Sequence, residues 1–254
     1  MALTRSPLQG ITNVLSFNWH FYAFAIIVLL TMVLSSHIIG NEWEWLFLCA
    51  SILVVVTTVI SLLVTYYVYD YSDLYDFKWL DDFPAGSARK ILNINAGFDE
   101  TSSILAEKFK GSELHVCDFY DPHNHTEISI KRARKAYPPH PSTVKVRTNS
   151  LPYSDQEFDV VCIAFAAHEI RNTDERQQFF EEIKRVTNVD GRIFVTEHLR
   201  DIHNFLAYTI GCFHFYSRAD WIRIFLFSQL NLLEERKTTA FVRTFILTTN
   251  GATS

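Results

Sequence analysis

The stretch ILNINAGFDETS at residues 91–102 has the pattern of a buried strand that turns into a helix across a ligand-binding loop. Gly97 would let the backbone approach a ligand, and Asn95 is among the few residues that tolerate a left-handed conformation. Asp99 is placed to be the helix N-cap, with Ser102 within its reach. The stretch has one glycine where such loops usually carry two or three, so an ordinary strand-to-helix connection is the alternative.

The charges of this loop select among cofactors. Asp99 and Glu100 stand where the pyrophosphate of a dinucleotide would need a positive helix end, so they disfavour that ligand. A sulfonium cofactor with an amino group meets no such obstacle. The next strand pattern ends in LHVCDFYDP at 114–122, and an acid there can hydrogen-bond a ribose diol. Asp118 is the candidate, with Asp121 next, and a turn or capping role for Asp118 is the alternative.

Strand-like and helical patterns alternate along the second half of the chain. The run FDVVCIAFA (158–166) is apolar without alternation, as in a strand buried on both faces of a parallel sheet. Two final strands joined by a short turn must be antiparallel. The chain is therefore predicted to be α/β, with a Rossmann-like, doubly wound, mostly parallel seven-stranded sheet and a C-terminal antiparallel strand. Strands are predicted at 90–95, 113–118, 144–146, 158–165, 192–197, 231–238 and 241–248, and helices at 100–109, 128–136, 174–187 and 217–230.

Two long apolar segments precede this domain. The runs 17–39 and 45–68 are each long enough to cross a bilayer as a helix, and together they predict a transmembrane hairpin. The short loop between them carries only acids, whereas Arg5 precedes the first run and Lys78 follows the second. By the positive-inside rule both termini and the second half of the chain lie in the cytoplasm. The chain is thus predicted to be a two-span membrane protein.

The predicted domains are the hairpin at 1–69, a juxtamembrane connector at 70–84 that lies along the membrane interface, and a catalytic domain at 85–254. The four cysteines include no CxxC pair, so no disulfide framework is predicted. The net charge of −5 gives no indication of a nucleic-acid partner. The sequence does not determine the oligomeric state.

The order and spacing of these motifs from about Lys90 to Thr249 resemble the class I S-adenosylmethionine-dependent methyltransferase family. A narrower, membrane-anchored group with two leading helices is similar in the phrases GFDETS, DFYDP, HTE and EHLRD. The family resemblance implies S-adenosylmethionine as cofactor. It is carried by ILNINAG (91–97), CDFYD (117–121), SLPYSDQEFDVVCIAFAAHEI (150–170) and EEIKRVTNVDGRIFVTEH (181–198).

The resemblance also implies the cofactor-binding residues. Family members commonly have an acid in place of Asn93 and glycines in place of Asn95 and Asp99. They also have an acid at the position of Thr148 or of Asn149. Asn93 can still hydrogen-bond the amino-acid end of the cofactor, and Asn149 could read an adenine amino group through its side-chain oxygen. The cofactor-binding set implied in this way is Asn93, Asn95, Ala96, Gly97, Asp118, Phe119, Asn149 and Ala164.

In this family the residues after the fourth strand face both methyl donor and acceptor, which implies His168 and Glu169 as catalytic residues. A histidine can take a proton from a phenol or an enol; capping of the following helix is the alternative for His168. The His-rich phrase DFYDPHNHTE (118–127) could suit a divalent metal, but a His-x-His pair on a loop is a weak signature, and no metal site is predicted.

The uncharged, aromatic segment 204–215 is predicted to be a lid or a membrane-contacting element, with core packing as the alternative. The predicted function is a membrane-anchored methyltransferase with the lipid bilayer as partner and a lipid-soluble or membrane-derived acceptor. The anchor motivates this acceptor, because tethering raises the effective concentration of molecules in the same bilayer. One alternative is a non-catalytic methyltransferase-like binding or assembly module. The other is a metal-dependent enzyme that uses the His-rich loop.

Overall fold

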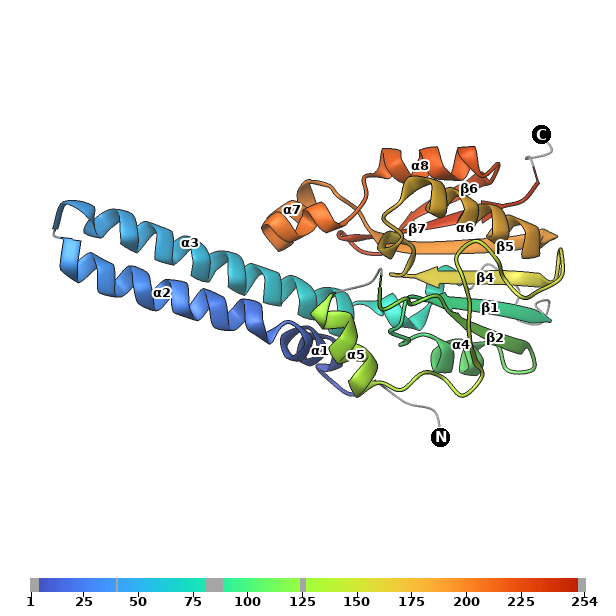
Figure 1. The fold of residues 1–254 in the computed structure, drawn as a ribbon, viewed down its shortest axis with the longest axis horizontal. Helices are drawn as coiled ribbons and strands as arrows, with labels where there is room; N and C mark the ends of the chain where they lie inside the picture. The colour runs from blue at the N-terminus through green and yellow to red at the C-terminus, as the bar shows by residue number, and fades with distance from the viewer. Residues whose placement is uncertain (1–4, 40, 81–88, 124–126, 251–254) are drawn as a thin grey trace.

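The computed structural model describes residues 5–39, 41–80, 89–123 and 127–250, in which the second half of the chain folds around one mixed sheet (Figure 1). The strands lie in the order β3-β2-β1-β4-β5-β7-β6. β7 is antiparallel to both neighbours, and the other neighbouring pairs are parallel. The predicted α/β sheet of seven strands is therefore confirmed. The strands are β1 (Lys90–Asn95), β2 (Glu113–Asp118), β3 (Thr143–Lys145), β4 (Phe158–Ala164), β5 (Thr187–His198), β6 (Asn231–Lys237) and β7 (Val242–Thr248).

The two faces of the sheet carry separate apolar layers, because successive side chains of a strand point to opposite sides. In β1, Leu92 belongs to the layer formed with α6 (Thr173–Val186) and α8 (Arg218–Phe227). Its neighbour Ile91 belongs to the opposite layer, formed with α4 (Ser102–Lys108). β1 is thus buried on both faces, as its uninterrupted apolar run indicates.

The second layer contains a part of the chain that the sequence placed elsewhere. Phe77 and Leu80 from the predicted connector are buried against Ile91 and β4. The connector therefore packs its apolar side chains into the core of the sheet domain rather than lying wholly along a membrane interface. The predicted domain boundary at 84/85 falls outside the described residues.

Some element bounds differ from the predicted ones. α4 begins at Ser102 with Thr101 as N-cap, so Asp99 is not the N-cap itself. Asp99 Oδ1 nevertheless accepts hydrogen bonds from the backbone N–H groups of Thr101 at 3.0 Å and Ser102 at 2.9 Å. β5 begins at Thr187, earlier than predicted, because Thr187 pairs with Phe158 before a register shift in the ladder. α5 spans Ile128–Ala136, as predicted.

Two long apolar helices extend from the sheet domain as a hairpin (Figure 1). α2 (Trp19–Ile39) has 21 residues and α3 (Asn41–Tyr66) has 26, which makes α2 about 32 Å long at a rise of about 1.5 Å per residue. Both are long and apolar enough to cross a membrane. The predicted first span begins two residues early, because Phe17 closes a separate helix, α1 (Gln9–Phe17), that contacts α5.

The aromatic segment 204–215 forms the end of α7 (Ile202–Tyr208) and the short 3₁₀ helix η5 (Thr209–His214). α7 contacts α3, so the segment lies beside the base of the hairpin (Figure 1). Asn204, Ala207 and Cys212 are buried, whereas Leu206 and Ile210 are exposed on the surface. An exposed apolar surface next to two apolar helices favours membrane contact over core packing.

Candidate active site

The loop after β1 is built from short polar contacts. The side-chain amide of Asn93 donates to Thr101 Oγ1 and Ser102 Oγ, both at 2.8 Å, and Asn95 Oδ1 accepts from Gly97 N at 3.0 Å. Gly97 has a φ of 98°, and a Cβ there would lie 3.0 Å from Tyr120 Cβ. Glycine is therefore required at position 97, both for its backbone angle and for the space it leaves.

Within the described part of the chain, three buried polar atoms at the end of β1 and in its loop have no hydrogen-bond partner: Asn93 Oδ1, Asn95 Nδ2 and Asp99 Oδ2. Buried polar atoms are normally paired, so three orphans in one loop point to a missing ligand. Two oxygen acceptors and one amide donor suit the ammonium and carboxylate groups of an amino acid. The loop thus fits the amino-acid end of S-adenosylmethionine, although glycines are replaced.

The predicted ribose site is closed by an arginine. Asp118 ends β2 and is buried. Its Oδ2 accepts from Arg134 Nη1 at 2.6 Å and its Oδ1 accepts from Tyr120 N at 2.8 Å. Arg134, on α5, also donates to Gly97 O at 3.2 Å. A ribose diol could reach the carboxylate of Asp118 only after the side chain of Arg134 moves. The residues at this end therefore fit the ribose of the cofactor only in that second arrangement.

A small cavity of about 70 Å³ lies at the carboxyl ends of β1 and β4, with Ala96 and Ala164 in its wall. Phe165 also lines it and has a φ of 52°, a left-handed angle that is rare for a bulky side chain. Strain of this kind persists only where surrounding contacts enforce it, and it is concentrated at functional sites. Phe165 N donates to Thr196 O at 2.9 Å, which holds the backbone in place.

A much larger cavity, of about 740 Å³, lies between the hairpin and the sheet domain. Phe165 and Ile130 line both this hairpin cavity and the small one, so the two are adjacent. One end of the hairpin cavity is polar, and the rest is lined mainly by side chains of α1, α2, α3 and α7. The polar end consists of Glu127, His168, Glu169 and His214; the remainder includes Val14, Phe21, Ala25, Ala207 and Ile210.

His168 lies between two carboxylates. Its Nδ1 is 2.7 Å from Glu197 Oε2, and its Nε2 is 3.3 Å from Glu169 Oε1. Burial lowers the pKa of His168, but the two carboxylates outweigh it and raise this pKa to about 10. Hydrogen bonds from His168 and His214 outweigh burial at Glu169 and hold its pKa well below the usual range. The imidazole therefore carries a proton at neutral pH in this arrangement, and its role as a base stays a prediction.

The predicted site residues fall into two groups. Asn93, Asn95, Ala96, Gly97, Asp118 and Ala164 meet around the loop and the small cavity, while His168 and Glu169 line the hairpin cavity. Phe119 is buried with its ring 5.5 Å from that of Phe179, as part of the core. Asn149 is exposed in the turn between Arg147 and Ser150, so its contact with adenine stays a prediction.

The structure gives Glu100 contacts that the sequence did not predict, and it adds Glu197 and His214 to the site. Glu100, in the cofactor loop, accepts from Arg5 at 2.8 Å, Asn13 at 3.1 Å and Tyr75 at 2.8 Å. These bonds tie α1 and the connector to the loop. His214 and Glu197 complete the surroundings of His168. His214 is one of eight histidines that follow residue 110, and this density is the one feature of the sequence that could have pointed to it.

The His-rich phrase 118–127 does not assemble as one cluster in the described part of the chain. Asp118 is bound to Arg134, Asp121 Oδ1 accepts from His123 N at 2.9 Å, and Glu127 lies 3.3 Å from His214. His125 falls outside the described residues. Among the described residues, one group of three metal-ligating side chains is close enough to hold an ion: His168, Glu169 and His214.

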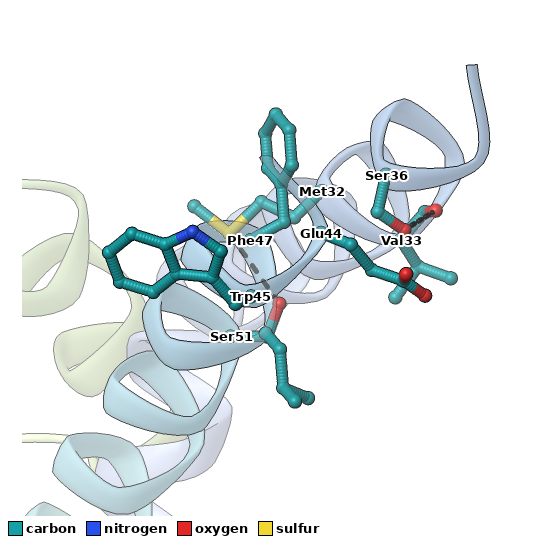
Figure 2. A pocket seen from close by; sticks show the side chains of 8 residues that line it. Met32, Val33, Ser36, Glu44, Trp45, Phe47 and Ser51 are labelled. Atoms are coloured by element: carbon teal, nitrogen blue, oxygen red, sulfur yellow. Dashed lines mark hydrogen bonds between the residues drawn. The ribbon is translucent and has the colours of Figure 1, made fainter. Parts of the chain in front are cut away.

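Another cavity lies between α2 and α3 near the far end of the hairpin, away from the sheet (Figure 2). It measures about 390 Å³, and Ser51 Oγ lies 3.7 Å from Met32 Sδ in its wall. Its other lining residues include Trp45, Phe47 and Glu44. None of the groups around the cofactor loop reaches it, so it is not the acceptor site considered below.

Similarity to known proteins agrees with this geometry. Residues 92–195 match the family model of a methyltransferase domain. The demethylmenaquinone methyltransferase of Paenarthrobacter aurescens (strain TC1) is 28% identical over 109 residues, which cover 43% of this chain and 38% of that protein. The enzyme of the same name from Clavibacter sepedonicus is 29% identical over 111 residues, which cover 44% and 42%. The chain thus spans less than half the length of these relatives.

A solved structure shares the fold. The crystal structure of a SAM dependent methyltransferase from Aquifex aeolicus has a TM-score of 0.52 at 15% identity, covering 76% of this chain and 98% of that one. At this identity the likeness concerns the fold alone. Residues 92–195 are thus similar to methyltransferase domains, and the chain shares its fold with a SAM dependent methyltransferase of known structure.

Proposed function

We propose that the chain is a membrane-anchored S-adenosylmethionine-dependent methyltransferase that acts on a lipid-soluble acceptor with a polar head group. The hairpin cavity is the observation that carries this proposal. It has about 740 Å³ of space, enough for a drug-sized molecule. It adjoins the small cavity at Phe165 and Ile130. Along the two long helices it is lined by Phe21, Tyr22 and Ala25 of α2 and by the hydroxyl-bearing Thr57, Thr58 and Ser61 of α3.

The shape of this cavity matches an acceptor with a ring and an apolar tail. The ring would lie near Phe165, within reach of His168 and Glu169, and the tail would follow α2 and α3. The two curated relatives are named for demethylmenaquinone, a quinone. An isoprenoid quinol is therefore the acceptor class that this proposal favours, with His168 and Glu169 as the residues that contact its reacting group.

The cofactor supplies an electrophilic methyl group on a sulfonium sulfur. In this proposal Asn93, Asn95 and Asp99 hold its amino-acid end through the three unpartnered atoms. Ala96 and Ala164 are small enough to leave room for the methyl donor in the small cavity. Asp118 would hold the ribose once Arg134 has moved, and Asn149 would lie toward the adenine. The main task of these residues is positioning, because methyl transfer is an in-line displacement.

The membrane anchor rests on the lengths of α2 and α3 and on their exposed apolar side chains. With Arg5 before the hairpin and Lys78 after it, the positive-inside rule places both ends in the cytoplasm. The polar end of the hairpin cavity would then lie at the cytoplasmic surface of the bilayer. A lipid acceptor could enter from the membrane without leaving the apolar phase.

One observation favours a second candidate, a non-catalytic binding module. Both carboxylate oxygens of Asp118 are engaged, one by Arg134 and one by Tyr120 N. If that ion pair never opens, the ribose of the cofactor has no acid to bind. Cofactor affinity separates the two candidates.

Calorimetric titration of the detergent-purified full chain with S-adenosylmethionine, S-adenosylhomocysteine and NAD is the first test. Saturable binding of the first two without NAD supports the enzyme. A second assay follows the labelled methyl group into a reduced quinone with a long isoprenoid tail and into the same head group without a tail. Preference for the tailed acceptor is the expected result. Absence of cofactor binding at millimolar concentration would favour the non-catalytic module.

A further inference from the structure

The polar end of the hairpin cavity has the ligand spacing of a metal site. His168 Nε2 and His214 Nε2 lie 3.3 Å and 3.5 Å from one atom, Oε1 of Glu169. All three potential ligand atoms lie within 4.8 Å of one another. Ligands bound at about 2.0–2.1 Å in a tetrahedron around Zn²⁺ are about 3.3 Å apart. The two shorter separations therefore already match those of neighbouring ligands around one ion.

Each imidazole also has a carboxylate behind it. His168 Nδ1 lies 2.7 Å from Glu197 Oε2, and His214 Nδ1 lies 3.3 Å from Glu127 Oε1. Metal-ligating histidines almost always donate their other ring N–H to a carboxylate, a carbonyl or a water. Such a bond keeps one proton on Nδ1, so the ion displaces only the second proton of the imidazolium, on Nε2, and binds the lone pair that is left there. His168 shows this arrangement directly. At His214 the guanidinium of Arg171 lies nearer to both ring nitrogens than the carboxylates do, so Glu127 takes the same role only when Arg171 moves away.

Glu197 holds His168 especially firmly. It is fully buried and also accepts from the backbone N–H of His168 at 3.2 Å. Because β5 carries Glu197 and the 3₁₀ turn after β4 carries His168, two neighbouring strands of the sheet fix this ligand. A preorganised ligand loses little freedom when it binds an ion, which is what a metal site on a rigid scaffold requires.

The carboxylates around the two imidazoles outnumber the guanidinium that opposes them, which favours a bound cation. Three carboxylates, those of Glu127, Glu169 and Glu197, surround the two imidazoles. One guanidinium opposes them: Arg171 Nη2 lies 2.5 Å and 2.7 Å from the ring nitrogens of His214. Arg171 is therefore a competing cation at this position. Its Nη1 also donates to the carbonyl of His214 at 2.6 Å, so binding of an ion requires this exposed side chain to give up its contacts with the imidazole of His214.

We propose that His168, Glu169 and His214 bind a divalent transition-metal ion, with Zn²⁺ as the reference ion, at the polar end of the hairpin cavity. Two imidazoles and one carboxylate are a common ligand set for such ions, and three protein ligands leave a coordination position open toward the cavity. The proposal that these three residues bind an ion rests only on the distances given above. The further assignment, that a hydroxyl oxygen of the acceptor takes the open position, rests on the proposed function.

Zinc binding by the untagged full chain in detergent tests the proposal. We expect one Zn²⁺ per chain in a titration against a competing chelator, and at least a 100-fold loss of affinity in His214→Ala and in Glu169→Gln. Glu197→Gln should weaken binding about 10- to 100-fold, as is typical of groups behind a ligand. His123→Ala, which removes an exposed histidine away from the cluster, should leave the affinity unchanged.

A gain of affinity provides the complementary test. Arg171→Met removes the competing cation, so it should tighten zinc binding about tenfold while thermal stability stays close to that of the wild type. Wild-type zinc affinity in His214→Ala, or no zinc binding by the wild-type chain, would overturn the proposal. S-adenosylmethionine binding is measured on the same samples without metal. If it persists while zinc binding fails, the metal site is wrong and the proposed methyltransferase function stands.

Discussion

Arg134 and Asp118 form an ion pair at 2.6 Å across the edge of the sheet where a cofactor ribose would lie. The guanidinium also contacts the ring of Tyr120, at 4.4 Å from its centroid, and the carbonyl of Gly97 at 3.2 Å. Arg134 therefore spans the glycine of the cofactor loop and the acid of the next strand. Because Asp118 is buried, this pair excludes other partners until Arg134 leaves.

Arg134→Gln should therefore tighten S-adenosylmethionine binding about tenfold, because the cofactor no longer competes with a charged hydrogen bond of about 1.5 kcal/mol. Asp118→Ala should abolish binding, because it removes the ribose acceptor itself. Calorimetry on both variants, with circular dichroism as the fold control, is the measurement. Weaker binding by Arg134→Gln would mean that Arg134 holds the cofactor rather than blocks it. Wild-type affinity in Asp118→Ala would remove Asp118 from the site.

The contacts of Glu100 predict that α1 is held on the cofactor loop. Its carboxylate accepts from Arg5, Asn13 and Tyr75, and its side chain is only 13% exposed. Glu100→Ala should therefore destabilise the docking of α1 by about 1–3 kcal/mol, the usual effect of leaving donors unpaired. Hydrogen exchange of the α1 amides should become faster than in the wild type. Glu107→Ala, at an exposed position of α4, is the matched control, and equal exchange in both variants would contradict the assignment.

Local patterns predicted the sheet and the loop because each strand carries its own burial signal. β1 and β4 read as apolar runs in the sequence and are buried in the structure, and Gly97 is where a positive φ is needed. The sequence around Phe77 and Leu80 gave no comparable indication that these side chains are buried in the core. An apolar side chain at a membrane interface and one in a core look alike in a sequence, so their place in the second layer became visible only in three dimensions.

The surroundings of His168 could be predicted only in part. Glu169 is its neighbour in the chain, but Glu197 comes from the end of β5 and His214 from the segment beside the hairpin. Their meeting depends on the parallel pairing of β4 with β5 and on the path of the chain after α7. The raised pKa of His168 could not be predicted for the same reason, because its second carboxylate, Glu197, is far from it in the sequence. Arg134 is a similar case: α5 was predicted, but the face it turns toward Asp118 was not.

The hairpin cavity predicts that its apolar part selects the tail of the acceptor. Ala25, on α2, lines this part, and Ala25→Trp would fill it. We expect at least a tenfold loss of kcat/KM for a quinol with a long isoprenoid tail and little change for the head group without a tail. Leu30→Trp, on the exposed surface of the same helix, is the control. Equal losses for both acceptors, or an equal loss in the control, would place the acceptor elsewhere.

The proposed topology predicts which residues a membrane-impermeant maleimide can reach in intact cells. In a background with Cys49→Ser, Glu44→Cys lies at the hairpin turn and should be labelled from outside. Lys110→Cys, at an exposed position of the sheet domain, should be labelled only after lysis. Cys117, Cys162 and Cys212 are buried and should contribute little background. The reverse pattern would invert the orientation, and equal labelling of both positions in intact cells would exclude a membrane-spanning hairpin.

The burial of His198 predicts that the folded protein loses stability in mild acid. Its Nε2 lies 2.8 Å from Tyr69 Oη, and its Nδ1 lies 3.0 Å from Phe241 O. Burial is the main cause that lowers the pKa of His198, to about 4. The unfolded histidine, with a pKa of about 6.5, binds a proton first as the pH falls, so folding loses stability from about pH 6.5 down to about pH 4.

From pH 7 to pH 5 this one group should cost about 2 kcal/mol of unfolding free energy, at about 1.4 kcal/mol per pH unit below 6.5. His168 weakly opposes this loss, because its raised pKa keeps it protonated in the folded state, whereas the unfolded group takes up its proton only as the pH falls through about 6.5. The measurement is urea unfolding of the wild type and of His198→Asn in detergent at both pH values. Asn keeps a donor for Phe241 O and does not titrate, so its smaller loss isolates His198. The same loss in both chains would show that His198 is protonated, or reached by water, in the folded protein.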